Sequence, residues 1–252
     1  QNFLVDKQIK TKIINNLYLN KDDKIIEVGP GKGALTEMIY EKVSSLLAIE
    51  LDDNLYLNLS SKYESENVNI IKADAKLFKI EDYLDNKEKY KFVGNLPYNV
   101  ANKIILNFLQ SLPKPEFMIV MLQLEVAKRI IGDEKFRGYL TIMIGIFCKS
   151  EILFQVKSTA FKPKPKVTSA VLKLIPYEKP KINISDINKF SDFVGKSFIS
   201  RRKTILNNIA SGHKISKNEA VEILNQSKIN LNLRPQNLSV DDWVKLYFIY
   251  KK

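Results

Sequence analysis

The sequence predicts an α/β fold in which a mostly parallel sheet ends in an antiparallel strand and is followed by a small all-helical domain. Three observations support this prediction. Short apolar runs rich in β-branched residues alternate with stretches of helical periodicity up to residue 131, a glycine-rich turn joins the first run to a helix, and only helical patterns follow residue 178. Such alternation is typical of a parallel sheet that helices cover on both faces.

The alternating part supplies the strands and helices of the predicted sheet. We expect strands over residues 24–28, 46–50, 68–73, 91–94 and 117–122. We expect helices over residues 6–19, 32–42, 53–63, 101–112, 124–131 and 139–149.

The pattern changes after these helices. Residues 151–156 and 169–174 alternate as strands do and are joined by the Pro- and Lys-rich segment 161–166, so we expect an antiparallel pair that ends the sheet. Helical patterns then cover residues 186–200, 201–209, 217–226 and 240–250. We therefore predict one domain over residues 1–178 and a second over residues 179–252.

The chain carries a surplus of positive charge. Its 252 residues include 40 Lys and Arg against 28 Asp and Glu, a net charge of +12. Residues 177–252 hold +7 of this surplus, and the longer remainder holds +5. The surplus indicates a polyanionic partner, nucleic acid first and an anionic membrane surface second, with a merely solvated basic surface as the alternative.

Scarce residues exclude several kinds of site. Cys148 is the only cysteine and His213 the only histidine, so we expect no disulfide, no Ser-His-Asp triad and no bound metal. A single cysteine suits a reducing compartment, the cytoplasm or an organelle matrix. The longest apolar run, residues 140–148, is too short for a membrane span. The first residues lack a signal-peptide layout and a Met, so we expect further residues upstream.

A glycine loop follows the first predicted strand, with the sequence EVGPGKG at residues 27–33. Glycines there permit a tight turn and let the backbone touch a ligand. Glu50 ends the second strand, where a carboxylate can accept both hydroxyls of a ribose. These features predict an adenosine-containing cofactor, with a plain strand-to-helix turn as the alternative. A Walker A loop is excluded because its Gly-Lys-Ser/Thr ending is absent.

Two further carboxylates bear on which cofactor is bound. Glu27 lies just before the glycine loop, where it would attract a cationic sulfonium and aminoacyl group but repel a pyrophosphate. Asp74 ends the third strand, where it can accept the adenine amino group. The pair favours S-adenosylmethionine over a nicotinamide dinucleotide.

The fourth strand runs into Asn95-Leu96-Pro97-Tyr98, at the edge where open α/β sheets bind ligands. Pro97 keeps Leu96 out of the helical region, so the Leu96 carbonyl can point into a pocket, and the Asn95 side chain offers a second acceptor. Tyr98 offers a flat aromatic face. Two acceptors beside an aromatic ring suit an exocyclic amine of a nucleobase whose lone pair attacks an activated methyl group. The alternative is a turn with a packed tyrosine.

These motifs together resemble the ribosomal small-subunit RNA adenine N6,N6-dimethyltransferases. The match covers residues 1–4, the glycine loop, Glu50, Asp74, residues 95–98 and the segment FKPKPKVTS at residues 161–169. The resemblance implies a Rossmann-like methyltransferase domain followed by a helical RNA-binding domain. It implies methyl transfer from S-adenosylmethionine to two adjacent adenosines near the 3′ end of small-subunit rRNA.

The resemblance also assigns residues to the site. It implies cofactor contacts at Asn2, Leu4, Gly29, Glu50, Asp74 and Asn95, to which the glycine loop adds Glu27 and Gly31. Asn95 and the Leu96 carbonyl would hold the target amine beside Pro97, and Tyr98 and Phe161 would stack on an adenine that has left its helix or loop. The expected partner is small-subunit rRNA in an immature 30S-type particle, bound by a monomer.

Basic side chains of two segments are candidates for contacts with RNA phosphates, with a solvated surface as the alternative for both. They are Lys162, Lys164 and Lys166 beside the predicted target pocket, and Arg201, Arg202 and Lys203 in the basic C-terminal part.

Three other functions are weighed against this one. A sister family methylates one adenine of large-subunit rRNA and confers macrolide resistance, but residues 201–208 and 234–243 look like the small-subunit enzymes, as does Leu96, where the resistance enzymes usually carry Ile. The second alternative is a nucleic-acid-binding relative without catalysis, against which the intact residues 95–98 argue. The third is a nicotinamide-dependent oxidoreductase, against which Glu27 argues.

Overall fold

A computed structural model describes residues 2–97, 100–133 and 137–251. The chain divides into two compact units, one made of residues 1–127 and 149–176, the other of residues 128–148 and 177–252. The chain passes between these units after residues 127, 148 and 176, and the predicted boundary after residue 178 lies next to the last of these points. It does not account for the first two, because residues 128–148 group with the C-terminal helices. Where an independently folding domain begins stays a prediction.

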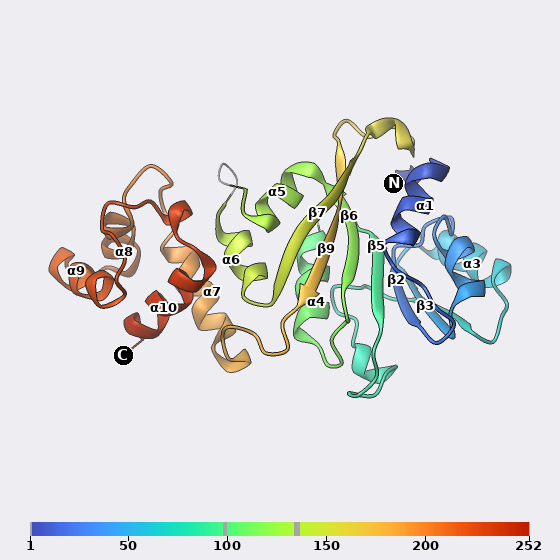
Figure 1. Ribbon diagram of the computed structural model, residues 1–252, viewed down its shortest axis with the longest axis horizontal. Coiled ribbons are helices and arrows are strands. Elements are labelled where there is room, and N and C mark those ends of the chain that lie inside the picture. The colour runs from blue at the N-terminus through green and yellow to red at the C-terminus, as the bar shows by residue number, and fades with distance from the viewer. Residues whose placement is uncertain (1, 98–99, 134–136, 252) are drawn as a thin grey trace. The chain divides into compact units, whose positions relative to one another are not determined.

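A seven-stranded sheet forms the first unit. Its strands lie in the order β4 (Val68–Lys72), β3 (Ser45–Glu50), β2 (Lys24–Val28), β5 (Lys91–Asn95), β6 (Met118–Gln123), β9 (Ser169–Pro176) and β7 (Cys148–Val156) (Figure 1). The five strands from β4 to β6 are parallel, and β9 runs antiparallel to β6. The predicted fold class is therefore confirmed, with β9 and β7 as neighbours at one edge of the sheet.

Helices cover both faces of this sheet. The helices of the first unit are α1 (Lys7–Asn15), α2 (Thr36–Ile39), α3 (Asp53–Lys62), α4 (Ala101–Gln110) and the first half of α5 (Leu124–Ile131). Val93 of β5 packs in one core cluster with Ile13 of α1 and Ile39 of α2. Its neighbour Phe92 meets Phe108 of α4, with ring centroids 4.8 Å apart. Because successive strand residues point to opposite faces, α1 and α4 lie on opposite sides of the sheet.

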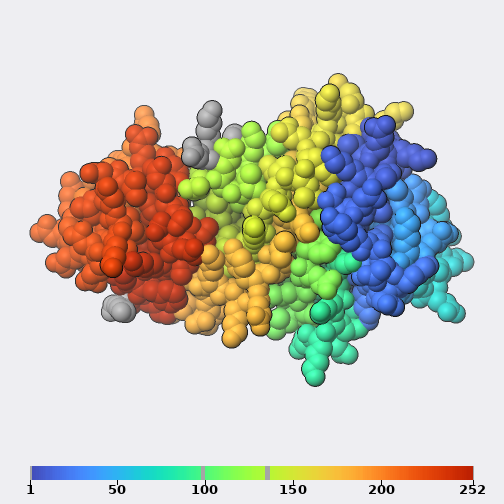
Figure 2. Space-filling model, viewed as in Figure 1, coloured from blue at the N-terminus to red at the C-terminus, as the bar shows by residue number. Residues whose placement is uncertain are grey.

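The N-terminal segment pairs with a distant part of the chain. β1 (Phe3–Leu4) runs antiparallel to β8 (Phe161–Lys162), and the backbone N–H of Val5 donates to the Ala160 carbonyl at 2.9 Å. In the space-filling view the N-terminal residues, in blue, adjoin the yellow residues that precede β9 (Figure 2). The sequence predicts only a loop over residues 161–166, because no local pattern marks a strand that is completed by residues near position 3.

The second unit is helical. Its helices are α6 (Tyr139–Gly145), α7 (Ile187–Lys196), α8 (Ile205–His213), α9 (Lys217–Gln226) and α10 (Val240–Tyr250). Trp243 of α10 is fully buried, stacks on Phe198 at a centroid distance of 5.1 Å and meets Phe193 edge-on. Trp243 therefore anchors the last helix in the core of this unit. None of the helices that the structure describes is long and apolar enough to cross a membrane.

Five predicted helices have bounds that differ by three residues or more. Those expected over residues 6–19 and 186–200 end earlier, at Asn15 and Lys196. The helix expected over residues 32–42 begins only at Thr36, because Gly33 has a φ of +80°, outside the helical region. The helix expected over residues 139–149 ends at Gly145, and Cys148 already begins β7. The helix expected over residues 201–209 begins at Ile205, since the Thr204 side chain caps it by accepting from the Asn207 N–H.

Candidate functional site

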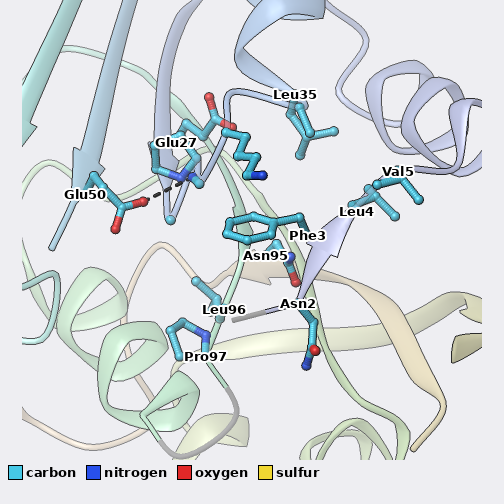
Figure 3. A pocket seen from close by; sticks show the side chains of 15 residues that line it. Asn2, Phe3, Leu4, Val5, Glu27, Leu35, Glu50, Asn95, Leu96 and Pro97 are labelled. Atoms are coloured by element: carbon cyan, nitrogen blue, oxygen red, sulfur yellow. Dashed lines mark hydrogen bonds between the residues drawn. The ribbon is translucent and has the colours of Figure 1, made fainter. Parts of the chain in front are cut away.

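A cavity of about 350 Å³ opens at the carboxyl ends of β2, β3 and β5, the edge at which the sequence predicts the site. Figure 3 shows that its walls come from the N-terminal segment, the glycine loop and the ends of the strands. The lining residues are Asn2, Phe3, Leu4, Val5, Glu27, residues 29–32, Ala34, Leu35, Glu50, Asn95, Leu96 and Pro97. Most of the predicted cofactor-binding residues therefore lie together around one cavity.

The glycine loop adopts a backbone that few other residues could form. Gly29 and Gly31 have φ values of +69° and +62°. A Cβ on Gly29 would lie 3.3 Å from the Asn95 carbonyl oxygen, and one on Gly31 would lie 3.2 Å from the Phe3 ring. The loop therefore needs glycine both for its dihedral angles and for its close approach to the two segments that face it.

Glu50 is held at the end of β3 by three backbone N–H groups. Its Oε2 accepts from Gly31 at 3.1 Å, and its Oε1 accepts from Leu51 at 2.9 Å and from Asp52 at 3.0 Å. The side chain is buried yet lines the cavity. A carboxylate has about four acceptor positions, so this one can still accept from a ligand hydroxyl.

Glu27 is a buried carboxyl group in the cavity wall. Thr36 Oγ1 donates to its Oε2 at 2.7 Å. Burial raises the pKa of Glu27 to about 7; the hydrogen bond from Thr36 opposes this rise, and the negative charge of Glu50 adds to it. Among the residues that the structure describes, no basic side chain forms an ion pair with Glu27. A ligand with a cationic sulfonium and ammonium group fits such a site, because it would favour the ionised carboxylate.

The predicted methyl-acceptor segment is anchored by its backbone. The Leu96 N–H donates to the Met121 carbonyl at 3.0 Å, and the Pro97 carbonyl accepts from Val100 and Ala101 at 3.1 and 3.0 Å, where α4 begins. Within the described chain no backbone donor reaches the Leu96 carbonyl. Its role as an acceptor for the target amine stays a prediction. Tyr98 lies outside the described residues.

Two predicted site residues do not line the cavity. Asp74 accepts from the Lys76 backbone N–H at 3.0 Å and pairs with the Lys76 ammonium at 3.0 Å. Although burial acts to raise its pKa, these two interactions outweigh burial and leave the Asp74 pKa below its usual value. Phe161 is 2% exposed and packs in the core with Leu4, its cross-strand partner. Its ring belongs to the core in this structure, and Phe161 is not among the residues that line the cavity.

Several residues of the site were given no role from the sequence. They are the lining residues Phe3, Val5, Pro30, Lys32, Ala34 and Leu35, and Thr36, the partner of Glu27. Phe3 lies beside predicted residues but carries no polar group, so it gave no chemical signal. Thr36 meets Glu27 only because α2 folds back over β2, and a spacing of nine residues predicts no such contact.

The predicted RNA-binding residues are exposed. Lys162, Lys164 and Lys166 are exposed on the first unit, and Pro165 between them is buried. On the second unit, Arg201, Arg202 and Lys203 are exposed in the turn before α8, not on a helix. Arg201 also has a structural contact, because its Nη2 donates to the Arg137 carbonyl at 3.0 Å.

The only histidine and the only cysteine have structural roles. His213, expected at the surface, is partly buried: it shares a hydrogen bond of 2.9 Å with Ser197 Oγ and packs against the rings of Phe193 and Tyr250. Burial, with help from Lys196, lowers its pKa. Cys148 is buried as expected, and burial raises its pKa to about 12, so its thiol is unreactive.

Solved structures share this fold over almost the whole chain. A dimethyladenosine transferase from Plasmodium falciparum has a TM-score of 0.79 at 23% identity and covers 99% of this chain and 97% of its own. The 23S rRNA methyltransferase ErmE has a TM-score of 0.75 at 24% identity and covers 99% of this chain and 100% of its own. At these identities the similarity establishes the fold alone.

Relatives in sequence are more informative. Proteins named ribosomal RNA small subunit methyltransferase A are 37% identical in Ureaplasma urealyticum and 37% identical in Sulfurihydrogenibium sp.. The matches cover 98% of this chain in both cases, and 89% and 93% of the two relatives. A family model described as ribosomal RNA adenine dimethylase matches residues 1–252. With the cavity, the glycine loop and the acceptor segment in place, these matches show that the chain belongs to the ribosomal RNA adenine dimethylase family.

Proposed function

We propose that this S-adenosylmethionine-dependent enzyme dimethylates N6 of two adjacent adenosines near the 3′ end of small-subunit rRNA. The observation that carries this proposal is the close approach of Gly29 to Asn95. A Cβ on Gly29 would lie only 3.3 Å from the Asn95 carbonyl oxygen. This approach holds the cofactor loop and the acceptor segment in contact within one cavity. The relatives named as small-subunit methyltransferases support the choice of substrate.

The residues of the cavity suit the cofactor from end to end. We assign Glu50 to the ribose hydroxyls, the backbone of Gly29 and Gly31 to the nucleoside, and Glu27 to the cationic end. Asn2 and Leu4 contribute the wall formed by the N-terminal segment. We assign Asp74, which does not line the cavity, to the adenine amino group. When bound, S-adenosylmethionine supplies a methyl group whose leaving group is a neutral thioether.

Asn95 and Leu96 would bind and orient the target amine. The Asn95 side-chain oxygen and the Leu96 carbonyl each accept one N–H of adenine N6, which directs the nitrogen lone pair toward the methyl group. The nitrogen forms the new bond to carbon, the carbon–sulfur bond breaks, and the surplus proton leaves to solvent. No histidine or thiol is needed, because the sulfonium already activates the methyl group. Stacking by Tyr98 stays a prediction.

The exposed basic residues would bind the phosphates around the target. Lys162, Lys164 and Lys166 lie in or just after β8, whose partner strand β1 lines the cavity. Arg202 and Lys203 would hold the RNA on the second unit. We propose an immature 30S-type particle as the substrate, a monomer as the active form and the cytoplasm as the location.

The test measures transfer of label from S-adenosylmethionine to immature small subunits that lack the modification. Wild-type protein should place methyl groups on two adjacent adenosines, two on each. Asn95→Ala should lower the rate by about 100-fold or more, as loss of a positioned hydrogen-bonding group does elsewhere. Asn69→Ala, which changes an exposed asparagine of β4, should keep the wild-type rate.

Other outcomes would contradict the proposal. Label in large-subunit rRNA but not in small subunits would favour the sister activity. RNA binding without label in either subunit would show a non-catalytic relative. Equal label from wild type and Asn95→Ala would refute the role of Asn95 while leaving the substrate intact.

A further inference from the structure

Phe3 lies in the middle of the cofactor cavity. Figure 3 shows its ring with Glu27 and Glu50 on one side and Asn95 and Leu96 on the other. The ring lies 3.2 Å from the ideal Cβ position of Gly31, and the Gly31 N–H in turn donates to Glu50. An apolar ring thus lies between the two polar ends of the site.

The strand pair holds this ring toward the cavity. Phe3 lies opposite Lys162, and Leu4 lies opposite Phe161. Leu4 lines the cavity too but is buried in the core with Phe161, and Phe3 points to the other side of the strand pair. The next residue, Val5, is tied to Ala160 by a hydrogen bond of 2.9 Å. The ring is therefore part of a fixed wall.

The ring already has one cation beside it. The Lys32 ammonium lies 4.9 Å from the ring centroid, within the range of a cation–π interaction. The buried Glu27 carboxyl also lines the cavity and forms no ion pair with a described basic residue. Aromatic faces attract cations most strongly where water is excluded, and here a π face and a buried carboxyl line the same space.

The cofactor carries its cation at the sulfur, which is bonded both to the ribose side and to the reacting methyl group. If Glu50 holds the ribose and Asn95 the target amine, as the proposed function states, the sulfur lies between them. The Phe3 ring lies in the cavity wall beside that position. We propose that Phe3 is a specificity residue, whose ring binds the sulfonium and makes the cavity prefer S-adenosylmethionine to its neutral-sulfur product, S-adenosylhomocysteine.

The preference matters for a reaction that needs several methyl groups. Each transfer turns the sulfonium into a thioether and removes the charge that the ring attracts. The product is then held less tightly than the next cofactor molecule, so exchange is favoured in the direction of continued methylation.

Calorimetric titration of the purified protein with each of the two ligands tests the proposal without any activity assay. Phe3→Leu keeps an apolar side chain but removes the π face. It should weaken S-adenosylmethionine by about 3- to 30-fold while changing S-adenosylhomocysteine by less than about 2-fold. Phe3→Tyr keeps the π face and should keep the wild-type ratio of the two affinities.

A matched control comes from another lysine-capped ring. The Lys12 ammonium lies 4.1 Å from the centroid of Phe154, which does not line the cavity. Phe154→Leu should leave both affinities unchanged, and thermal melting checks that every variant is folded.

Three results would overturn the proposal. Equal weakening of both ligands by Phe3→Leu would make the ring an apolar cover, and tighter binding of both would make it an obstruction. Both results leave the proposed function standing, because the wild-type protein still binds its cofactor. Failure of the wild-type protein to bind either ligand would overturn the proposed function as well.

Discussion

Thr36 Oγ1 donates a 2.7 Å hydrogen bond to Oε2 of Glu27, and both residues are buried. One hydroxyl group therefore stabilises the ionised form of a carboxyl whose pKa burial raises to about 7. The other charged group that bears on it is Glu50, which disfavours ionisation. The protonation of Glu27 near neutral pH thus depends on a contact between the start of α2 and β2.

Thr36→Val should make cofactor binding depend more strongly on pH. The variant keeps the shape of the side chain but loses the donor, so the Glu27 pKa rises further and less of the carboxyl is ionised at pH 7. Cofactor affinity at pH 7 should fall by about 3- to 10-fold and recover toward pH 9. Calorimetric titrations between pH 6 and 9 measure this, and Thr36→Ser should restore the wild-type profile. A loss of affinity that is the same at every pH would contradict the role of the hydroxyl.

Glu27→Gln should stabilise the ligand-free protein and weaken its cofactor site. The pKa of Glu27 is about 7 in the folded chain against an ordinary value of 4.5, so its contribution to stability is present below pH 4.5 and is lost as the pH rises through 7. The variant should melt a few degrees higher than wild type at pH 8, with little difference at pH 4.5. Scanning calorimetry at the two pH values checks this. A variant that melts lower at pH 8 would show that other groups stabilise the ionised carboxylate enough to offset the cost of its burial.

Gly31→Ala should damage the cavity without unfolding the sheet. The φ of +62° is unfavourable for alanine, and the added methyl would press on the Phe3 ring at 3.2 Å. We expect a loss of about 1–2 kcal/mol in the free energy of unfolding and a drop in cofactor affinity of about tenfold or more. Gly195→Ala is the control, since its new Cβ in α7 meets only Tyr139, at 4.0 Å, and it should be neutral or slightly stabilising. An unchanged cofactor affinity for Gly31→Ala would show that the loop does not touch the ligand.

Neutralising the basic turn before α8 should weaken RNA binding alone. Replacing Arg201, Arg202 and Lys203 with Gln should reduce the slope of log K against log salt by about 0.7–0.9 for each RNA phosphate that these side chains neutralise, with cofactor affinity unchanged. Binding of an rRNA fragment at several salt concentrations measures the slope. Lys217→Gln with Lys245→Gln removes charge from other exposed positions and should have a smaller effect. A comparable fall in cofactor affinity in the triple variant would contradict this division of labour.

The three side chains of that turn should differ in their effects on stability and on RNA affinity. Arg201 donates to the Arg137 carbonyl, and the Arg201 carbonyl accepts from Gln236 Nε2 at 3.1 Å. Arg201→Gln should therefore lower the melting temperature, whereas Arg202→Gln and Lys203→Gln should change RNA affinity at constant melting temperature. Thermal melting of the single variants decides this. Equal melting temperatures for all three would remove the structural role of Arg201.

The sheet could be predicted because its determinants are local. Four of the five parallel strands, β2, β3, β5 and β6, are short buried apolar runs. The positions of Glu27 and Glu50 follow from the ends of β2 and β3, so both line the cavity as expected. The same reasoning fails where distant residues decide. Nothing near Phe161 indicates that it pairs with Leu4, and this pairing sends its ring to the core.

Segment 128–148 groups with the C-terminal helices for a related reason. Its apolar pattern continues that of the sheet helices, but Gly145 packs closely against Val240, with an ideal Cβ 2.7 Å from that side chain. Because Val240 lies far from Gly145 in the sequence, the periodicity of residues 128–148 does not predict this contact.

The pairing of β1 with β8 also sets an order of events during synthesis. β1 leaves the ribosome long before residues 161 and 162 are synthesised. It therefore stays unpaired while the strands between β1 and β8 are made. The wall that carries Phe3 is completed only when the end of this unit has been made. A nascent chain interrupted before β8 would therefore lack a finished cofactor cavity, and competence for the reaction is acquired as one of the last steps in the folding of this unit.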